Sequence, residues 1–466
     1  MLTMDIFYLA VSVLLIASLL TVKASPRLLP VLFIVFLAGG MAAGFEGPGG
    51  IYFYSPYFAK SIAFFMLIAG VFYAGVSLQK DSYRQIATGG ILLGIIGYAA
   101  SVAVITLLAQ FMLNLELKRA LVLGAVIAVT DPIGSNAMRL KQTKTDTLLS
   151  LEAGISVALA VFATLGFVDY ATLVNRTIVD LGAFFIVQSG LGIVIGFVLG
   201  IGFVSVVNKI NFRQPGLYIV FFLVYIMLAF ALSSVLGGNG ILAVLITGIF
   251  ASMSSFVHRR SAIAFFEGLN WIGSLTAFIL LGLIVVPSQL LDGIGAGIGF
   301  AVAAFLVSIT IAFVILLFSP LSPKQRIVAA LSRSKGSANI LLSTLFMIPS
   351  FSRPEQLLNI VFTVILFFII YQAFVLPLLV SFFSEEKVDK DQGRLVLSSL
   401  TMPVGGKKVA ELSIPGAARI AMIGRGDTTL IPDGNTELRE GDSLQFVCSE
   451  EEITPLTEYF DSFKQD

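Results

Sequence analysis

The sequence Ala128-Val-Thr-Asp-Pro-Ile-Gly134 lies inside an apolar stretch, residues 120–138, that is long enough to cross a membrane. Pro132 and the glycine interrupt helical hydrogen bonding, and Asp131 places a carboxylate at the interruption. A helix broken inside a membrane frees backbone carbonyl groups, which can bind an ion beside Asp131 and the Thr130 hydroxyl. A plain proline kink, with Asp131 capping the second half-helix, is the alternative interpretation.

A second interruption is expected at Ser332-Arg-Ser-Lys-Gly-Ser-Ala-Asn339, where another apolar span opens. The two breaks fall in the fifth and twelfth spans, so they are seven spans apart. This spacing indicates an inverted repeat of spans 1–6 and 8–13, and paired interrupted helices point to a transporter site. Glu152 follows Asp131 by one loop, and a buried ion pair between Glu152 and Lys335 would bridge the halves. Separate solvated ends for these two residues are the alternative.

The composition indicates a chain that lives mostly in lipid. Hydrophobic residues make up 57% of the 466 residues and charged residues only 12%, whereas a soluble domain carries about 25% charged residues. We expect an all-α polytopic membrane protein with about thirteen transmembrane helices, two of them broken, in residues 1–384. The expected spans are 4–22, 28–45, 59–78, 87–112, 120–138, 148–168, 182–207, 216–236, 239–253, 268–286, 294–318, 336–349 and 356–383.

The distribution of basic residues predicts the orientation in the membrane. Fifteen Lys and Arg residues fall in one set of alternate loops and five in the other set. Basic loops favour the cytoplasmic side. We therefore expect a multi-pass protein of the cell membrane with an odd number of spans, the N-terminus outside and the C-terminal end in the cytoplasm.

The C-terminal part has a different composition. Residues 385–393 form a charged linker, and from residue 385 onward the chain carries 9 Lys and Arg against 16 Asp and Glu. Residues 394–466 contain short alternating runs typical of strands, with turn residues at Gly424-Arg-Gly-Asp427 and short helices near 408–412 and 451–459. A small α+β domain is expected here.

Several classes of site are excluded by residue counts. Cys448 is the only cysteine and His258 the only histidine, which excludes an internal disulfide, a thiolate metal cluster and a multi-histidine metal site. No nucleophile–base set or phosphate-binding loop is present. We expect no enzyme activity, no metal and no nucleic-acid partner.

The membrane part resembles the monovalent cation:proton antiporter superfamily, and within it the bacterial potassium/proton antiporters of the cell-volume-regulation type. The matching strings are Gly47-Pro-Gly-Gly-Ile51, Val129-Thr-Asp-Pro-Ile133, Leu236-Gly-Gly-Asn-Gly-Ile-Leu-Ala243, Phe265-Phe-Glu-Gly-Leu269, Phe278-Ile-Leu-Leu-Gly-Leu283 and Asn359-Ile-Val-Phe362. The resemblance implies a homodimer of thirteen-span subunits, in which a core domain rocks against a dimerisation domain.

The tail resembles a TrkA-C domain, the C-terminal half of an RCK module. The matching strings are Val409-Ala-Glu-Leu412, Ile431-Pro-Asp-Gly434 and Leu438-Arg-Glu-Gly-Asp-Ser-Leu444. The resemblance implies dimerisation and, in some members, a small regulatory nucleotide. The glycine-rich dinucleotide fingerprint is absent from the sequence, so NAD binding is not implied and no other cofactor is expected.

The sequence departs from the antiporter pattern at the residues that usually hold the ion. The Asn-Asp pair of the sixth span corresponds to Ser156 and Val157, and an acidic residue of the third span corresponds to Tyr73. The arginine of the twelfth span falls on Lys335. Exchange needs a carboxylate that holds either a proton or a cation, and a valine holds neither.

Two functional hypotheses follow from these departures. In the first, the protein exchanges K⁺ or Na⁺ for protons at a site formed by Asp131, Thr130 and Ser156, under regulation by the tail. In the second, transport is impaired and the protein acts as a sensor or scaffold. Both hypotheses treat Val157 and Tyr73 as positions where the family's acidic residues have been lost.

Overall fold

The computed structural model divides the chain into two compact units, Met1–Glu385 and Glu386–Asp466. It describes residues 12, 16, 29–50, 55–78, 87–131, 143–172, 178–290, 294–347, 353–383 and 395–463, apart from 404, 407, 413, 417, 427, 450 and 451. The predicted first span 4–22, apart from residues 12 and 16, Pro132 with Gly134, and the linker 385–393 lie outside the described residues.

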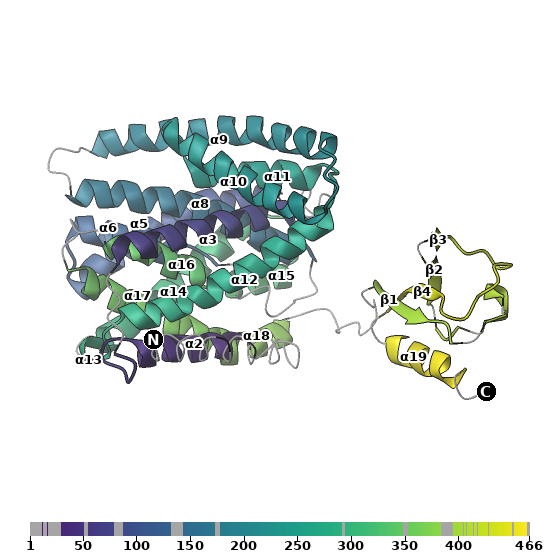
Figure 1. Cartoon of the computed structure of the whole chain (residues 1–466). Helices are drawn as coiled ribbons and strands as arrows, with labels where there is room; N and C mark the ends of the chain where they lie inside the picture. The colour runs from purple at the N-terminus through teal and green to yellow at the C-terminus, as the bar shows by residue number, and fades with distance from the viewer. Residues whose placement is uncertain are drawn as a thin grey trace. The chain divides into compact units, whose positions relative to one another are not determined.

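The first unit is helical throughout its described part (Figure 1). Eight described helices are long and apolar enough to cross a membrane, and three shorter apolar helices accompany them. The helices of this unit are α2 (Leu29–Ala43), α3 (Pro56–Val76), η2 (Leu93–Gly97), α5 (Tyr98–Leu113), α6 (Leu117–Ala128), α8 (Thr143–Thr172), α9 (Ile178–Lys209), α10 (Gly216–Val235), α11 (Gly240–Met253), α12 (Arg259–Ile284), α13 (Pro287–Leu290), α14 (Ile294–Leu316), α15 (Pro323–Leu331), α16 (Ser337–Ser343), η3 (Thr344–Met347), α17 (Pro354–Ile370), η4 (Tyr371–Val375) and α18 (Leu376–Phe383).

These helices confirm a mostly helical membrane protein. Each predicted span from residue 28 onward coincides with a helix, although for 120–138 only the first half, α6, is described. The last predicted span is one continuous run formed by α17, the π-helical turn η4 and α18. Because most of the first predicted span lies outside the described residues, the total of about thirteen stays a prediction.

The end of one helix and the interruption of another meet in this unit. Helix α6 ends at Ala128, and α15 and α16 are separated by the non-helical residues 332–336. The Asp131 amide donates to the Ser334 carbonyl over 3.0 Å, and the Ser334 hydroxyl donates to the Asp131 carbonyl over 2.6 Å. Backbone groups that leave a helix inside the membrane need partners within the protein. Each break thus supplies partners to the other.

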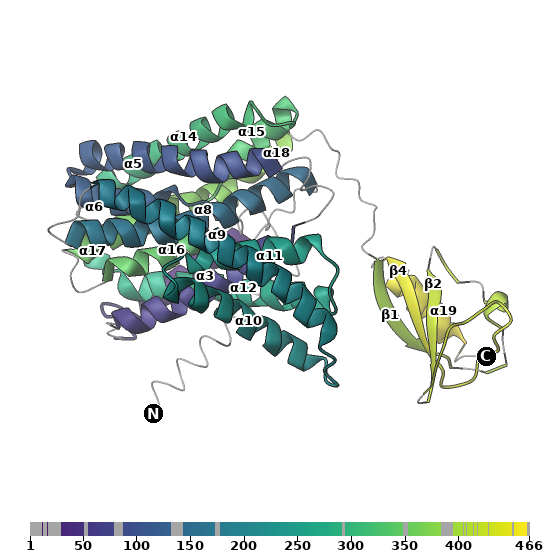
Figure 2. The ribbon, with the colours of Figure 1, turned by 90° about the horizontal axis from the view of Figure 1, so that it is seen from above.

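The second half-helix, α16, is the central element of the unit. It packs against α3, α6, α8, α12 and α17, and lies among them in both views (Figures 1 and 2). All seven of its residues are buried, including Ser337 and Asn339. Buried polar side chains need hydrogen-bond partners inside the protein, so Ser337 and Asn339 must find theirs among the residues around the two breaks.

The second unit is a small domain with a four-stranded antiparallel sheet in the order β1-β4-β2-β3. Its elements are β1 (Leu395–Thr401), η5 (Val409–Glu411), β2 (Arg419–Arg425), β3 (Thr428–Leu430), β4 (Ser443–Ser449) and α19 (Ile453–Ser462). Leu444, Phe446, Leu456 and Phe460 contribute to its apolar core. The expected strand-containing C-terminal domain is therefore present.

Candidate functional site

Asp131 lies at the end of the first break, and only 3% of its surface is exposed. Its Oδ2 atom accepts hydrogen bonds from the Ser337 hydroxyl (2.8 Å) and from the Ala338 amide (3.0 Å). A Cβ atom on Gly336 would lie 2.8 Å from the same oxygen, so a glycine is needed for the backbone to approach this closely. These donors are neutral, and they hold the carboxylate without supplying a countercharge.

Glu152 on α8 is held quite differently. The Arg333 Nε atom and a terminal guanidinium nitrogen donate to Glu152 Oε1 over 3.0 and 2.9 Å. The same guanidinium donates to the Thr130 hydroxyl and to the Ser308 carbonyl. Glu152 and Arg333 are both buried, so each charge is stabilised chiefly by the other.

The predicted ion pair between Glu152 and Lys335 is not formed. The Lys335 ammonium instead donates to the Ala128 and Val129 carbonyls at the C-terminal end of α6, over 3.1 and 2.8 Å. Helix C-terminal carbonyls carry partial negative charge, so they suit a buried ammonium group. A guanidinium group can donate several hydrogen bonds in one plane, which suits it to Glu152, Thr130 and Ser308 together.

Asn339 satisfies further carbonyl groups of the first break. Its amide nitrogen donates to Val126 and Val129, and its amide oxygen accepts from the Gly336 amide. The carbonyl groups that the sequence offered as ion ligands therefore already accept hydrogen bonds from Lys335 or Asn339.

Among the described residues in and beside the two breaks, the formal charges of the buried side chains balance. Asp131 and Glu152 supply two negative charges and Arg333 and Lys335 two positive charges, all on buried side chains. Burying a single unmatched charge is costly, whereas a balanced set is tolerated when its members are also hydrogen-bonded. The set is neutral while Asp131 is ionised, so either a proton or a monovalent cation at Asp131 adds one positive charge.

A cavity of about 50 Å³ opens beside Asp131. It is lined by residues of α3, α8, α12 and α16, and Asp131 is the only carboxylate among the described residues of its wall. The polar members of the wall are Tyr73, Ser77, Asp131, Ser150, Asn270, Ser274 and Ser337. A volume of this size holds a small ion or a few water molecules.

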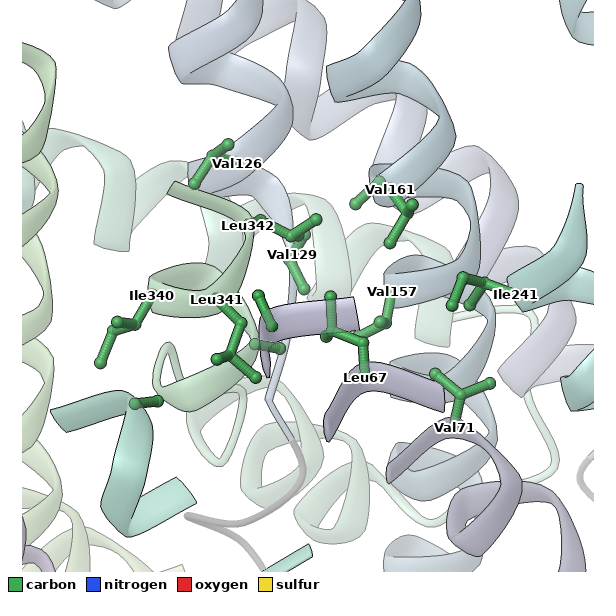
Figure 3. Packing of buried hydrophobic residues seen from close by; sticks show 14 of the residues in the cluster. Leu67, Val71, Val126, Val129, Val157, Val161, Ile241, Ile340, Leu341 and Leu342 are labelled. Carbon is green, nitrogen blue, oxygen red and sulfur yellow. The ribbon is translucent and has the colours of Figure 1, made fainter. Parts of the chain in front are cut away.

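Val157 and Tyr73 both line the same cavity as Asp131. Figure 3 shows Val157 beside Leu67 in the packing of buried apolar side chains around the site. The two positions where the sequence lacks the family's acidic residues thus face the cavity. The site as a whole is more apolar on the α3 and α8 sides than the antiporter pattern implies, and Asp131 is left as its carboxylate.

The other predicted site residues lie elsewhere. Ser156 is buried and donates to the Ala153 carbonyl of its own helix, and it is not part of the cavity wall. Thr130 faces Arg333 instead of the cavity. The structure therefore brings Asp131 together with Ser337, Ser274 and Asn270, and it does not bring Asp131 together with Ser156.

Sequence reasoning missed Ser337, Ser274 and Asn270. Asn270 and Ser274 are four residues apart, so they share one face of α12. Polar residues at that spacing inside an apolar span were a usable signal. Ser337 was contained in the string that predicted the second break, but no pattern tied it to Asp131 rather than to the neighbouring turn.

The comparisons with known proteins agree with this architecture. The family model "Sodium/hydrogen exchanger, transmembrane" matches residues 11–382, and the model "TrkA-C domain" matches residues 401–461. A K⁺/H⁺ antiporter NhaP2 of Shewanella baltica is 26% identical over 480 residues, covering 97% of this chain and 83% of that protein. The K⁺/H⁺ antiporter NhaP of Alkalimonas amylolytica is 24% identical, covering 96% and 82%.

A solved structure shares the fold. The sodium proton antiporter MjNhaP1 of Methanocaldococcus jannaschii at pH 8 superposes with a TM-score of 0.65 at 17% identity, covering 79% of this chain and 99% of the other. The matched family model covers residues 11–382, which is most of the chain and nearly all of the helical unit. This chain therefore belongs to the sodium/hydrogen exchanger family of cation/proton antiporters, and it carries a TrkA-C domain at its C-terminal end.

Proposed function

We propose that the protein exchanges a monovalent cation for a proton at Asp131, and that the cation is K⁺. The observation that carries this proposal is that Asp131 is the one carboxylate among the described residues of the cavity wall. The choice of K⁺ is supported by relatives named K⁺/H⁺ antiporters over nearly the whole chain.

The cation and the proton would compete for the same carboxylate. Oxygen ligands suit alkali cations, and Asp131 with the Ser337 hydroxyl offers them at the cavity, while the Asn270 amide and the Ser274 hydroxyl lie in the facing wall. A proton and K⁺ each carry one positive charge, so either one bound at Asp131 leaves the same net charge. One-for-one, electroneutral exchange follows from this equality.

The sensor or scaffold hypothesis rested on the loss of acidic residues at Val157 and Tyr73. Both positions line the cavity of Asp131, and Asp131 itself supplies the one carboxylate that exchange requires. No comparison supports the sensor or scaffold alternative, and the family is one of transporters.

We also propose the finer topology. The charge bias of the loops supports thirteen spans, an outside N-terminus and a cytoplasmic TrkA-C domain. The division into a transport domain 1–384, a linker 385–393 and a regulatory domain 394–466 is supported by the change in composition. Homodimerisation, and control of transport by a small nucleotide on the TrkA-C domain, are supported by the family resemblance alone.

Proton flux in proteoliposomes tests the proposed exchange. A K⁺ gradient should drive proton movement through the wild-type protein, with Na⁺ tested separately, and the Asp131→Asn variant should show background flux. The asparagine keeps an oxygen that can accept from Ser337 and Ala338, so it preserves the local structure. Equal flux in the two proteins would remove Asp131 from the mechanism, and flux with Na⁺ alone would reassign the cation.

A further inference from the structure

The hydroxyl of Ser274 on α12 has two acceptors and one hydrogen. Its Oγ atom lies 2.8 Å from the Asn270 carbonyl in its own helix and 3.3 Å from the Ser337 Oγ atom on α16. Ser337 in turn donates to Asp131 Oδ2. Ser274, Ser337 and Asp131 are all buried, and hydrogen bonds between buried groups are electrostatically stronger than in water.

We propose that Ser274 is a positioning residue, which connects the protonation state of Asp131 to α12 through a chain of hydrogen bonds that reverses its direction when Asp131 takes up a proton. This inference rests on the proposed exchange at Asp131. It adds a route by which protonation of Asp131 affects α12, a helix whose described residues in the cavity wall are uncharged.

With Asp131 ionised, the carboxylate can only accept hydrogen bonds. Ser337 then donates to Asp131, and Ser337 accepts from Ser274 whenever Ser274 turns away from Asn270. With a proton on Oδ2, Asp131 donates to Ser337, Ser337 donates to Ser274, and Ser274 donates to the Asn270 carbonyl. Each serine keeps its own hydrogen and only rotates its hydroxyl, so no proton is gained or lost along the chain.

The two states differ in how firmly α12 is tied to α16. In the ionised state Asn270 and Ser337 compete for the single hydrogen of Ser274, and the Asn270 carbonyl is the nearer acceptor. In the protonated state every donor of the chain has its own acceptor, so the link between the two helices is complete. Proton binding at Asp131 therefore strengthens the contact between α16 and α12.

The charged and titratable neighbours of Asp131 come from three elements. Tyr73 on α3 lines the same cavity, and Lys335 lines a smaller cavity on the other side of Asp131. Glu152 on α8 is paired with Arg333 in the second break. The described residues that α2, α12, α16, α17 and η4 contribute to the two cavities are uncharged.

Removing either hydroxyl should shift the pH profile of exchange, in opposite directions. In Ser274→Ala, the Ser337 hydrogen loses the acceptor that it needs when Asp131 is protonated. This unsatisfied donor destabilises the protonated state. The ionised state loses only the polarisation of Ser337 by Ser274, which is a smaller effect. The profile should therefore move about one unit toward lower pH, and the KM for K⁺ at acid pH should fall because the proton competes less well.

In Ser337→Ala, the ionised carboxylate loses a charge-assisted donor, and such bonds are the stronger ones. The profile should therefore move toward higher pH. In the Ser337→Ala background, Ser274→Ala should cause no further shift, because the chain is already interrupted. Ser274→Thr keeps a hydroxyl and should keep the wild-type profile.

The matched control is Ser252→Ala on α11, whose hydroxyl donates to the Ile249 carbonyl of its own helix. This variant should leave the profile unchanged. Ser274→Cys keeps roughly the volume of the side chain, but its sulfur is a weak acceptor for the Ser337 hydrogen, so it should repeat the shift of Ser274→Ala even if the alanine variant folds poorly.

The decisive experiment is K⁺-dependent proton flux in proteoliposomes across a range of pH for these variants and Asp131→Asn. Opposite shifts for Ser274→Ala and Ser337→Ala, with a double variant that shows only the shift of Ser337→Ala, support the chain. An unshifted Ser274→Ala and Ser274→Cys, or shifts of one sign for both serines, overturn it. Wild-type exchange by Asp131→Asn would overturn the proposed function as well, whereas an inactive Asp131→Asn with unshifted serine variants would overturn the chain alone.

Discussion

The broken-helix region has a charge-paired side and a cavity side, and each contains one buried carboxylate. On the paired side, Glu152 is neutralised by Arg333 at 2.9 Å. On the cavity side, Asp131 is held by the Ser337 hydroxyl and the Ala338 amide. The Arg333 countercharge leaves Glu152 little affinity for a mobile cation, whereas Asp131 lies in the wall of the cavity. This contrast favours a structural role for Glu152 and supports the proposed exchange at Asp131.

The largest expected effect is on the cavity side. Asp131→Asn should lower cation-driven proton flux by at least about 100-fold, because a carboxamide neither takes up a proton nor supplies a charge to the cation. The protein should still be recovered folded. Flux in proteoliposomes, with the amount of reconstituted protein measured, checks this expectation. Retained flux would show that the two carboxylates had been assigned the wrong way round.

On the paired side the expected effect is on folding. Glu152→Gln leaves the Arg333 guanidinium buried without its countercharge, which should destabilise the protein by about 3–5 kcal/mol. Thermal unfolding of the detergent-solubilised protein measures this loss. The double variant Glu152→Leu with Arg333→Met removes both charges and should recover much of the stability. A single variant as stable as wild type would mean that the pair does not hold the breaks together.

The third prediction concerns a substitution that restores the acidic residue of the antiporter pattern in the cavity wall. Val157→Asp places a second carboxylate in the wall of the same cavity. Two carboxylates in one small site cannot both ionise easily. The pH profile of exchange should therefore move about one unit or more toward higher pH, with no increase in the maximal rate. Val157→Asn is the uncharged control, and a faster maximal rate in Val157→Asp alone would show that Asp131 does not suffice.

The smallest expected effect concerns an ion pair in the TrkA-C domain, outside the membrane. Arg425 at the end of β2 donates two hydrogen bonds to Asp442, beside the start of β4. These bonds hold the pKa of Asp442 below its usual value. A carboxyl group whose pKa is lowered by folding stabilises the folded state above its unfolded pKa, near 3.9, and that contribution is lost as the pH falls through the folded value.

Hydrogen exchange in the full-length protein can detect this contribution. At neutral pH, Asp442→Asn should speed amide exchange in β2 and β4 by roughly tenfold. The difference between variant and wild type should disappear as the pH falls below the folded pKa of Asp442. Exchange in α19 serves as an internal reference, and an undiminished difference in acid would argue against the ion pair as its cause.

Much of the fold could be predicted from the sequence because the length of an apolar segment can be read from the residues of that segment alone. Spans of about 20 residues follow from hydropathy, and both breaks followed from strings rich in proline, glycine and serine. The partner of Glu152 could not be predicted in this way. Arg333 and Lys335 are two residues apart in an irregular segment, where spacing does not decide which side chain faces which neighbour. Only the packing of α6, α8 and α14 around the break separates them.

The candidate site was predicted in part for the same reason. Asp131 stood out because an ionisable residue inside a span is rare and costly. Its partners Ser337 and Ser274 lie more than 140 residues away in the chain, and common residue types at such distances carry no pattern. Ser156 was expected from its alignment with the antiporter pattern, yet one residue further along α8 it is Val157 that faces the cavity.

The dependence of the K⁺ KM on pH in wild-type proteoliposomes tests the central claim most directly. If one proton and one K⁺ compete for Asp131 alone, the KM should rise about tenfold for each unit that the pH falls below the apparent pKa of the site, while the maximal rate at saturating K⁺ is less affected. A KM that does not change with pH would contradict a shared carboxylate. A rise of about a hundredfold per unit would contradict a single one.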